Sequence, residues 1–383
     1  MADYVNDRPY AGTGLERALL HKLVDILHQV GWLGEVRARG AERSAPDGAD
    51  TIVHVGLEKA SEGELRVHLK KDLRPGAFPA WAERRRLVSG KTVAPVLAMP
   101  FVSPRLADLC KEAGWSWHDL AGNCRIDLPG LLYIERSGIV PVRRSPRPGA
   151  NLGTAAAARV LRALLSPAHA GRAWKQRGLQ TQTCWPKIGT DEPVSLGLVN
   201  KVIRHLRDEG FVEEADARGV RVRDPSGLLA AWTKAYRFDR HERRTYFSLL
   251  KGADLQQALY RVGLEAGGMA AYAAFSAAER QAPHVRQPKT WVYVGAAYLD
   301  SLIRHTQAKE VDSGDNMVVL VPDDSGVFLS FDADSHVGAP RLGCTDPAQT
   351  YVDLAHCGGR GEEAAQALLE QKILPAWKAV ARE

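Results

Sequence analysis

One helical stretch, residues 195–210, constrains the fold more than any other part of the chain. Its apolar residues stand at i, i+3, i+4 and i+7: Val199, Val202, Ile203 and Leu206. This spacing places them on one face of an α-helix. Ser195 is a favoured residue for capping the start of a helix, and Gly210 is a favoured residue for ending one. Because an apolar helix face is stable only when buried, we expect this helix to pack against neighbouring elements.

Two short strands are predicted directly after this helix, at residues 211–214 and 220–223. A helix followed by a small basic hairpin is typical of a winged helix-turn-helix, which places one helix in the major groove of DNA. Further helices at residues 154–165 and 228–236 complete a domain predicted to span residues 154–238. Residues 166–193 show no clear pattern and are expected to be irregular.

Charge is distributed unevenly along the chain, whose formal net charge is +6. Residues 1–142 sum to +1, residues 143–240 to +9 and residues 241–383 to −4. The positive charge is therefore concentrated in the segment that contains the predicted helix and hairpin. Double-stranded DNA is the first partner that this concentration suggests, and a basic surface without a partner is the alternative.

The polar face of the predicted helix carries side chains suited to reading bases. Asn200 can form two hydrogen bonds with adenine, and Lys201 and Arg204 can bind guanine or phosphate. Leu198 can contact a thymine methyl group, and Gly197 lets the DNA backbone approach closely. A protein-binding winged helix is the other interpretation. The predicted DNA-binding residues are Ser195, Gly197, Leu198, Asn200, Lys201, Arg204, Arg218, Arg221, Arg223, Arg143, Arg144 and Arg147.

The pattern predicts an α+β multidomain protein with three domains and one linker. Residues 1–140 read as helix, three strands, helix, strand, helix and two strands, which indicates a mixed α/β N-terminal domain. Residues 141–153 are rich in proline, glycine and arginine and are expected to form an exposed linker. Residues 239–383 indicate an α/β C-terminal domain. Within these domains we expect single strands at residues 124–134 and 326–331 and a helix at residues 270–278.

The composition excludes several classes of protein. Hydrophobic residues make up 45% and charged residues 25%, as in ordinary globular proteins. No run approaches the roughly 18 apolar residues that a membrane span needs, and the first residues do not resemble a secretion signal. The five cysteines are not spaced for a disulfide framework or a zinc site. We therefore expect a cytoplasmic protein with reduced thiols, no membrane association, no metal and no cofactor.

The N-terminal domain allows a second hypothesis, a Mg²⁺-dependent nuclease of the restriction-endonuclease type that the winged helix directs to its target. Such enzymes place an aspartate before one strand and an acid-x-lysine pair on the next, so that two acids bind Mg²⁺ and the lysine assists water. Asp50 and Lys70 fit this spacing. His68 stands where the second acid belongs, and Glu64 lies to one side. This departure favours a domain without catalysis, and hence a protein that is not an enzyme.

Three stretches together resemble the AbiEi-family antitoxins of type IV toxin–antitoxin systems, in the larger group that contains a winged helix. Residues 109–126 resemble an Asp-x-x-Gly-Asn signature through Asp119, Gly122 and Asn123. Residues 194–212 are similar to the family's recognition helix. Residues 345–354 and 359–365 resemble its C-terminal signature. The matching residues there are Tyr351, Asp353, Leu354, Gly359, Arg360 and Gly361.

The resemblance implies a DNA-binding autorepressor that binds repeats in its own promoter. It also implies a cognate nucleotidyltransferase-like toxin encoded beside it. Association into a homo-oligomer would place two recognition helices on repeated half-sites. The chain departs from the family at residues 172–193, which are longer than the usual first helix of the helix-turn-helix. Because the family also includes proteins without a toxin partner, transcriptional regulator is the broader expectation.

Overall fold

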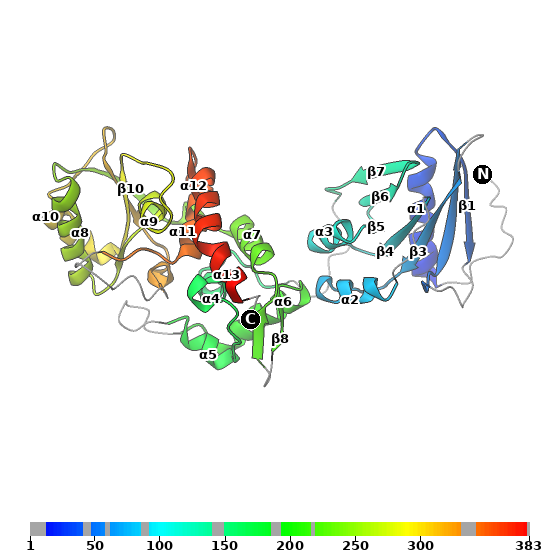
Figure 1. The fold of residues 1–383 in the computed structure, drawn as a ribbon, viewed down its shortest axis with the longest axis horizontal. Coiled ribbons are helices and arrows are strands. Elements are labelled where there is room, and N and C mark those ends of the chain that lie inside the picture. The colour runs from blue at the N-terminus through cyan, green and yellow to red at the C-terminus, as the bar shows by residue number, and fades with distance from the viewer. Residues whose placement is uncertain are drawn as a thin grey trace. The chain divides into compact units, whose positions relative to one another are not determined.

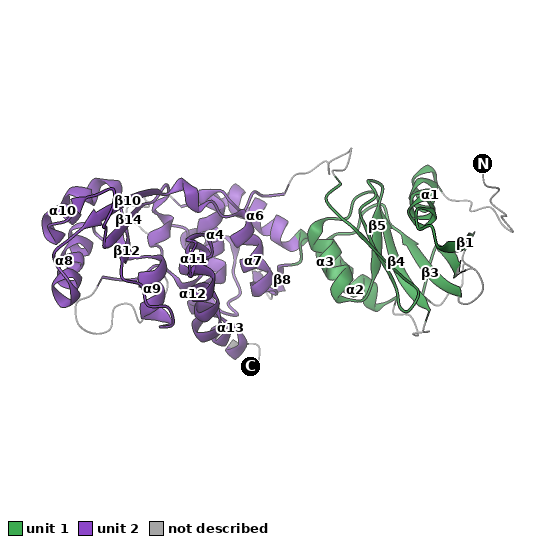
Figure 2. Cartoon of the chain, turned by 90° about the horizontal axis from the view of Figure 1, so that it is seen from above, with its two compact units in different colours: residues 1–148, 208–210 green, residues 149–207, 211–383 purple. Residues whose placement is uncertain are grey.

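The computed structural model describes residues 13–40, 47–57, 62–85, 92–139, 149–184, 193–215, 219–330 and 342–380. The chain divides into two compact units (Figures 1 and 2). Unit 1 comprises residues 1–148 and 208–210, and unit 2 comprises residues 149–207 and 211–383. Helices and strands occur in both units, which confirms the mixed α and β composition. The predicted domain boundary between residues 238 and 239 falls inside unit 2.

Unit 1 is built on a seven-stranded sheet whose strands lie in sequence order. The strands are β1 Leu33–Gly40, β2 Thr51–Leu57, β3 Glu62–Leu69, β4 Val93–Met99, β5 Ser116–Asp119, β6 Cys124–Leu128 and β7 Leu132–Arg136. The pairs β3–β4 and β4–β5 are parallel, and the other neighbours are antiparallel. Parallel neighbours need a crossover connection. The two crossovers contain α2 (Phe78–Glu83) and α3 (Pro104–Glu112).

Helices cover both faces of this sheet. Helix α1 (Gly14–His28) packs on one face, which includes Val96 and Ala98 of β4. Helices α2 and α3 pack on the opposite face, which includes Leu97 and Met99 of the same strand. Successive strand residues point to opposite faces, so this one apolar strand serves two cores. The single strand predicted at residues 124–134 is wrong, because the chain turns at Gly130, where φ is +74°, and returns as β7.

Unit 2 begins with three helices, a hairpin and a fourth helix. These are α4 (Ala155–Leu165), α5 (Gln176–Thr181), α6 (Leu196–Asp208), β8 (Val212–Ala215), β9 (Gly219–Val222) and α7 (Pro225–Ala235). The predictions for α4, α6 and the two strands are confirmed to within a residue or two. The prediction that residues 166–193 are irregular is wrong in part, because α5 lies there and is anchored by the fully buried Leu179.

The remainder of unit 2 is a five-stranded sheet with helices packed around it. The sheet order is β11–β12–β14–β10–β13. The strands are β10 Glu242–Phe247, β11 Ala270–Tyr272, β12 Thr290–Val294, β13 Lys309–Glu310 and β14 Met317–Val321. The helices are α8 Gly252–Glu265, α9 Ala274–Gln281, α10 Leu299–Thr306, α11 Pro347–His356, α12 Gly361–Leu368 and α13 Leu374–Val380. The helix predicted at 270–278 is instead β11 and α9, and residues 325–328 form a 3₁₀ helix rather than a strand.

One hydrophobic core joins the first half of unit 2, which contains α4 to α7, to the second half, which begins at β10. Leu161 of α4, Val202 of α6 and Trp232 of α7 share it with Ala348 and Val352 of α11. Deleting the chain after residue 240 would therefore expose the core beneath α4 and α7.

The exposed linker predicted at residues 141–153 includes residues at its C-terminal end that are buried. Ala150 and Leu152 are only 8% and 7% exposed and pack into this core. Residues 141–148 of the predicted linker lie outside the described part of the chain.

All five cysteines lie in the described part of the chain, and none forms a disulfide there. Within the described ranges, no helix has both the length and the apolar character needed to cross a membrane.

Candidate nucleic-acid interface

Helix α6 buries one face and exposes the other, as its sequence predicts. The four residues of its apolar stripe, Val199, Val202, Ile203 and Leu206, are at most 1% exposed. The exposed residues on and just before the helix include Ser195, Gly197, Asn200, Lys201 and Arg204. Leu198 differs from the other predicted contact residues, because its side chain is half-buried and packs against the core.

The start of α6 is fixed by its own side chains. Leu198 donates its backbone N–H to the Ser195 hydroxyl oxygen at 3.3 Å, which is the contact expected of an N-cap. One turn later, the Asn200 amide nitrogen donates to the carbonyl of Leu196 at 3.1 Å. These bonds hold the exposed face of the first turn in a defined geometry.

Two cations of α6 have no ion-pair partner among the described residues, and a third has one. Within the described residues, neither Lys201 nor Arg204 forms an ion pair. Arg207, one turn further along, has its guanidinium 3.8 Å from the carboxylate of Glu214. Lys201 and Arg204 therefore present full positive charges to solvent at the exposed face of the helix.

A third strand segment joins the β8–β9 hairpin. Trp174 and Val220 exchange two backbone hydrogen bonds, with N···O distances of 2.8 and 2.9 Å. Trp174 is only 2% exposed, so the contact is fixed by burial as well. The order along the chain is thus α4, a strand residue, α5, α6 and the hairpin.

Three basic residues near this segment were missed by the sequence analysis. Arg172, Lys175 and Arg177 are exposed on α5 and on the segment that leads into it. The Arg172 guanidinium carbon lies 3.9 Å from the centroid of the Trp174 ring. The only signal in the sequence was the presence of three cations around one tryptophan, because residues 166–193 have no clear periodicity.

The hairpin presents two of its predicted basic residues. Arg221 is exposed on β9, with its guanidinium 3.3 Å from the Glu213 carboxylate on the neighbouring strand. Arg223 is exposed just after β9. Arg218, and the linker residues Arg143, Arg144 and Arg147, lie outside the described residues.

Two arginines of α4 point into the protein instead. Arg159 binds the Asp324 carboxylate with Nε at 3.0 Å and Nη2 at 2.6 Å. Arg162 is 2% exposed and donates from Nε to the Gln349 side-chain oxygen at 2.5 Å. Asp324 follows β14 and Gln349 lies on α11, so these bonds fix α4 to the second half of unit 2.

Asp353 of α11 lies at the centre of the same buried network. Its Oδ1 accepts hydrogen bonds from the Tyr236 hydroxyl at 2.7 Å, from the Gln349 amide at 2.7 Å and from the Tyr293 hydroxyl at 3.1 Å. Burial raises the pKa of Asp353 to about 7, although the hydrogen bonds act in the opposite direction. His241, whose Nε2 lies 2.8 Å from the Tyr236 hydroxyl, has its pKa lowered to about 4 by burial.

The residues of the nuclease hypothesis lie at the adjacent strands β2 and β3 of unit 1: Asp50 directly precedes β2, Glu64 and His68 are on β3, and Lys70 directly follows it. Asp50 Oδ2 accepts a hydrogen bond from the Leu69 backbone N–H at 2.8 Å. His68 is fully buried, whereas Glu64 lies 4.0 Å from His54 and 3.6 Å from Arg66. Within the residues that the structure describes, no three histidine, cysteine, aspartate or glutamate side chains gather as a metal site.

The Asp-x-x-Gly-Asn stretch forms a closed turn. Asp119 Oδ1 accepts from the backbone N–H groups of Gly122 and Asn123, each at 3.0 Å. Gly122 has a φ of +100°, which side chains other than hydrogen rarely allow. The Asn123 amide donates to the Ile139 carbonyl at 2.9 Å. These contacts give the stretch a structural role in joining β5 to β6.

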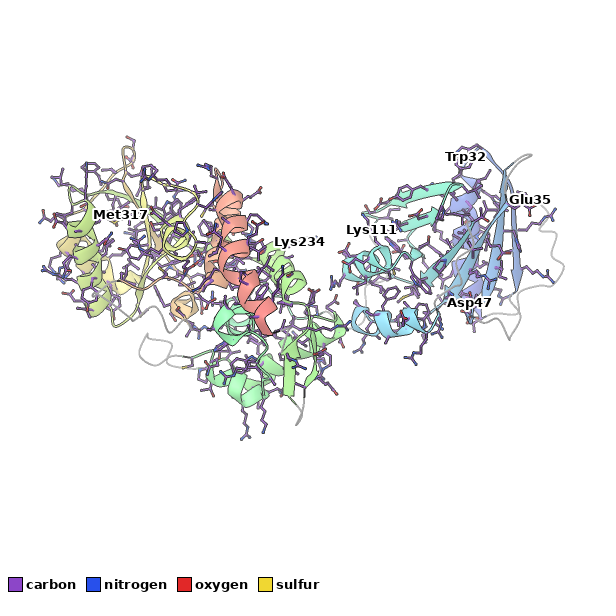
Figure 3. The ribbon with its side chains drawn as sticks, viewed as in Figure 1. Trp32, Glu35, Asp47, Lys111, Lys234 and Met317 are labelled. Carbon is purple, nitrogen blue, oxygen red and sulfur yellow. The ribbon has the colours of Figure 1, made fainter. Side chains whose placement is uncertain are left out.

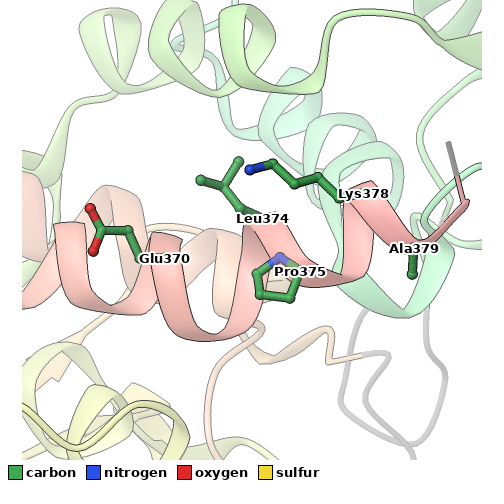
Figure 4. A pocket seen from close by; sticks show the side chains of 5 residues that line it. All are labelled: Glu370, Leu374, Pro375, Lys378 and Ala379. Atoms are coloured by element: carbon green, nitrogen blue, oxygen red, sulfur yellow. The ribbon is translucent and has the colours of Figure 1, made fainter. Parts of the chain in front are cut away.

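A pocket of about 450 Å³ lies beside α13 and is lined by Glu370, Leu374, Pro375, Lys378 and Ala379 (Figure 4). Its lining has one carboxylate and one ammonium group among apolar side chains. A catalytic pocket typically gathers several polar groups around one point. This pocket lacks such a constellation and is not a candidate active site.

Comparison with known proteins identifies one family. Residues 221–374 match the model for a transcriptional regulator, AbiEi antitoxin, of the type IV toxin–antitoxin system. No curated protein and no solved structure matches the chain. The matched residues include the C-terminal signature around Tyr351 and Asp353, whereas the stretches 109–126 and 194–212 both lie outside them. The match confirms the resemblance, and over residues 221–374 the chain is similar to the AbiEi family of transcriptional regulators and antitoxins.

Proposed function

We propose that the protein is a DNA-binding antitoxin and autorepressor, and that α6 is the recognition helix of a winged helix-turn-helix at residues 154–238. The observation that carries this proposal is that Lys201 and Arg204 are exposed and form no ion pair with any described residue, on a helix whose opposite face is buried. The order of α4, the Trp174 strand segment, α5, α6 and the hairpin supports it, because a winged helix has this succession of elements.

Within this proposal each side chain has a distinct role. Asn200 pairs with adenine, and Lys201 and Arg204 bind guanine or phosphate in the major groove. Ser195 and Gly197 let the helix start approach the DNA backbone. Arg221 and Arg223 contact phosphates from the wing, with Arg218 and the linker arginines extending that contact. We add Arg172, Lys175 and Arg177 as phosphate contacts, since they are exposed and basic.

The second half of unit 2 is proposed to make protein contacts. Residues 241–383 carry a net charge of −4, which disfavours phosphate contact. The family match lies mostly in this region and supports a toxin partner, which we propose to be nucleotidyltransferase-like. Two copies of the chain would place two recognition helices one DNA turn or a multiple of it apart, about 34–36 Å per turn.

Binding to the DNA upstream of the chain's own gene tests the proposal directly. The full chain is titrated into that duplex and into a shuffled duplex of equal length and composition at the same salt concentration. A specific regulator binds its operator about 10³-fold or more tighter than other DNA. Equal affinity for the two duplexes overturns the autorepressor proposal. Rescue of growth on co-expression with the neighbouring toxin gene tests the antitoxin role separately.

A further inference from the structure

Unit 1 carries a basic surface that the proposed function does not use. Lys70 and Lys71 follow the end of β3, and Arg84 and Arg85 follow the end of α2. The Lys70 ammonium lies 5.9 Å from the centroid of the Trp81 ring, and the Arg85 guanidinium carbon lies 4.6 Å from it. We refer to these five residues as the Trp81 cluster. Lys70 and Arg85 thus lie against the same ring, and Lys71 and Arg84 are their neighbours in the sequence.

The cations of the Trp81 cluster have no acidic partners in the described part of the chain. Arg84 donates from Nε to the Ala80 carbonyl at 3.1 Å, and Arg85 donates from Nη1 to the Trp81 carbonyl at 3.3 Å. Lys71 and Arg84 are exposed, and Lys70 and Arg85 are half-buried. The positive charge of the cluster is thus available to an external anion.

The interior next to the cluster is closed by aromatic rings. His68 is fully buried, with its ring centroid 5.5 Å from that of Trp81 and 5.1 Å from that of Trp115. These rings surround His68, which stands where a nuclease of this type would hold its second acid. Asp47, which Figure 3 places at the same end of the sheet as α2, is 4% exposed and lies 4.0 Å from the His68 ring.

We propose that the Trp81 cluster is a second DNA-binding surface, which holds the phosphates of duplex DNA without cutting them. Lysine and arginine are the usual phosphate ligands. Contacts with phosphate do not depend on the base sequence, so this surface would bind any duplex. Trp81 is in contact with Arg85, His68 and Trp115, so its ring supports the cations rather than stacking on a base. The proposal extends DNA contact to unit 1, beyond the function proposed for unit 2.

Salt dependence of binding tests this surface in the full chain. The probe is a duplex of random sequence, which removes the contribution of base reading. The test variant is Lys70→Gln/Arg85→Gln, and the matched control is Arg17→Gln/Lys22→Gln on α1, which packs on the opposite face of the sheet. Each lost phosphate contact lowers the slope of log K against log salt by about 0.9, so the test variant should lose about 1.8 and the control nothing. An unchanged slope in the test variant overturns the proposal.

Two further measurements guard against a variant that fails to fold. Lys71→Gln/Arg84→Gln changes only exposed residues and should give a similar loss of slope. In the unaltered protein, bound DNA should protect Lys70 and Lys71 from acetylation but leave Lys22 reactive, and equal reactivity with and without DNA contradicts the proposal. Cleavage of the duplex in Mg²⁺ also overturns it. Because Lys201→Ala/Arg204→Ala affects promoter recognition but not this protection, failure of either proposal is visible separately.

Discussion

Helices α4 and α6 share one core in unit 2 but use their basic residues in opposite ways. The side chains of Arg159 and Arg162 on α4 are 16% and 2% exposed and bind partners from the second half of the unit. Lys201 and Arg204 on α6 are exposed and form no ion pair with any described residue. Helix α4 therefore has cations that stabilise the fold, whereas α6 has cations that are free to bind a ligand.

This difference shows what a net charge can and cannot indicate. The +9 of residues 143–240 includes both kinds of cation. A buried, paired arginine holds two parts of the chain together, and removing one partner leaves the other without compensation. Mutating an exposed, unpaired cation changes the stability of the protein little. Its effect becomes measurable when the protein binds a polyanion. The two helices should consequently respond to mutation in different assays.

The largest expected effect is on stability, at Arg162. Arg162→Ala removes the hydrogen bond to Gln349 and the charge 4.0 Å from Asp324. Arg159 still pairs with Asp324 in this variant, so the cost comes from the Gln349 oxygen that loses its donor and from the cavity left by a buried side chain, together about 2–5 kcal/mol. Urea unfolding measures the loss, and Lys201→Ala serves as the control with little change. A loss below about 1 kcal/mol for Arg162→Ala would remove the contrast between α4 and α6.

The next expected effect is on the pH dependence of stability, at Asp353. The folded-state pKa of about 7 lies above the usual value of 3.8, so the folded chain holds a proton that the unfolded chain has lost between these values. The stability from this protonated state is complete below about pH 4 and is lost as pH rises through 7. His241, with a lowered pKa of about 4, acts in the opposite direction between pH 4 and 6.5.

Comparison with Asp353→Asn isolates the aspartate, because the His241 contribution is common to both proteins. Tyr236, Tyr293, Gln349 and Arg162 are the other polar groups that act on Asp353. The stability of the variant relative to the unaltered protein should rise as pH increases from 4 to 8. Parallel pH profiles for the two proteins would show that Asp353 does not titrate in this way.

Specificity should depend on Asn200. A well-formed pair of hydrogen bonds to a base contributes about 1–3 kcal/mol of discrimination against the wrong base. Asn200→Ala should therefore reduce the ratio of promoter affinity to shuffled-duplex affinity by that amount, with a smaller effect on the shuffled duplex itself. A change that is equal on both duplexes would assign Asn200 a structural role, such as its bond to Leu196.

The smallest effect is expected at the hairpin. Arg221 is exposed and already paired with Glu213, so Arg221→Ala should change stability by about 0–1 kcal/mol. Its loss should lower the slope of log K against log salt by about 0.9 if it contacts one phosphate. An unchanged slope would exclude Arg221 from the interface.

The sequence predicted those elements whose local pattern agreed with their packing. The stripe of α6, the cap at Ser195 and the strands on either side of residues 216–218 could be found because each is specified within a few residues. The strand pairing of Trp174 could not be predicted, because its partner Val220 lies far along the chain. The burial of Arg162 depends on Gln349 in the same way.

Errors at β11 and at residues 325–328 arose from short apolar runs, which do not distinguish strand from helix. Ala270–Tyr272 is a strand because it pairs with β12, although alanine favours helices. Tertiary pairing overrides a weak local preference at this position. The candidate site was predictable at α6, whereas its basic neighbours Arg172, Lys175 and Arg177 required the structure.

Promoter binding by Lys201→Ala/Arg204→Ala tests the central claim most directly. The control is Lys234→Ala/Lys251→Ala, which removes two exposed cations elsewhere in unit 2. Two lost base contacts of about 1–3 kcal/mol each should weaken promoter binding by roughly 30-fold or more, with unfolding midpoints unchanged. The control should bind as the unaltered protein does. If both double variants bind the promoter with unaltered affinity, α6 is not the recognition helix.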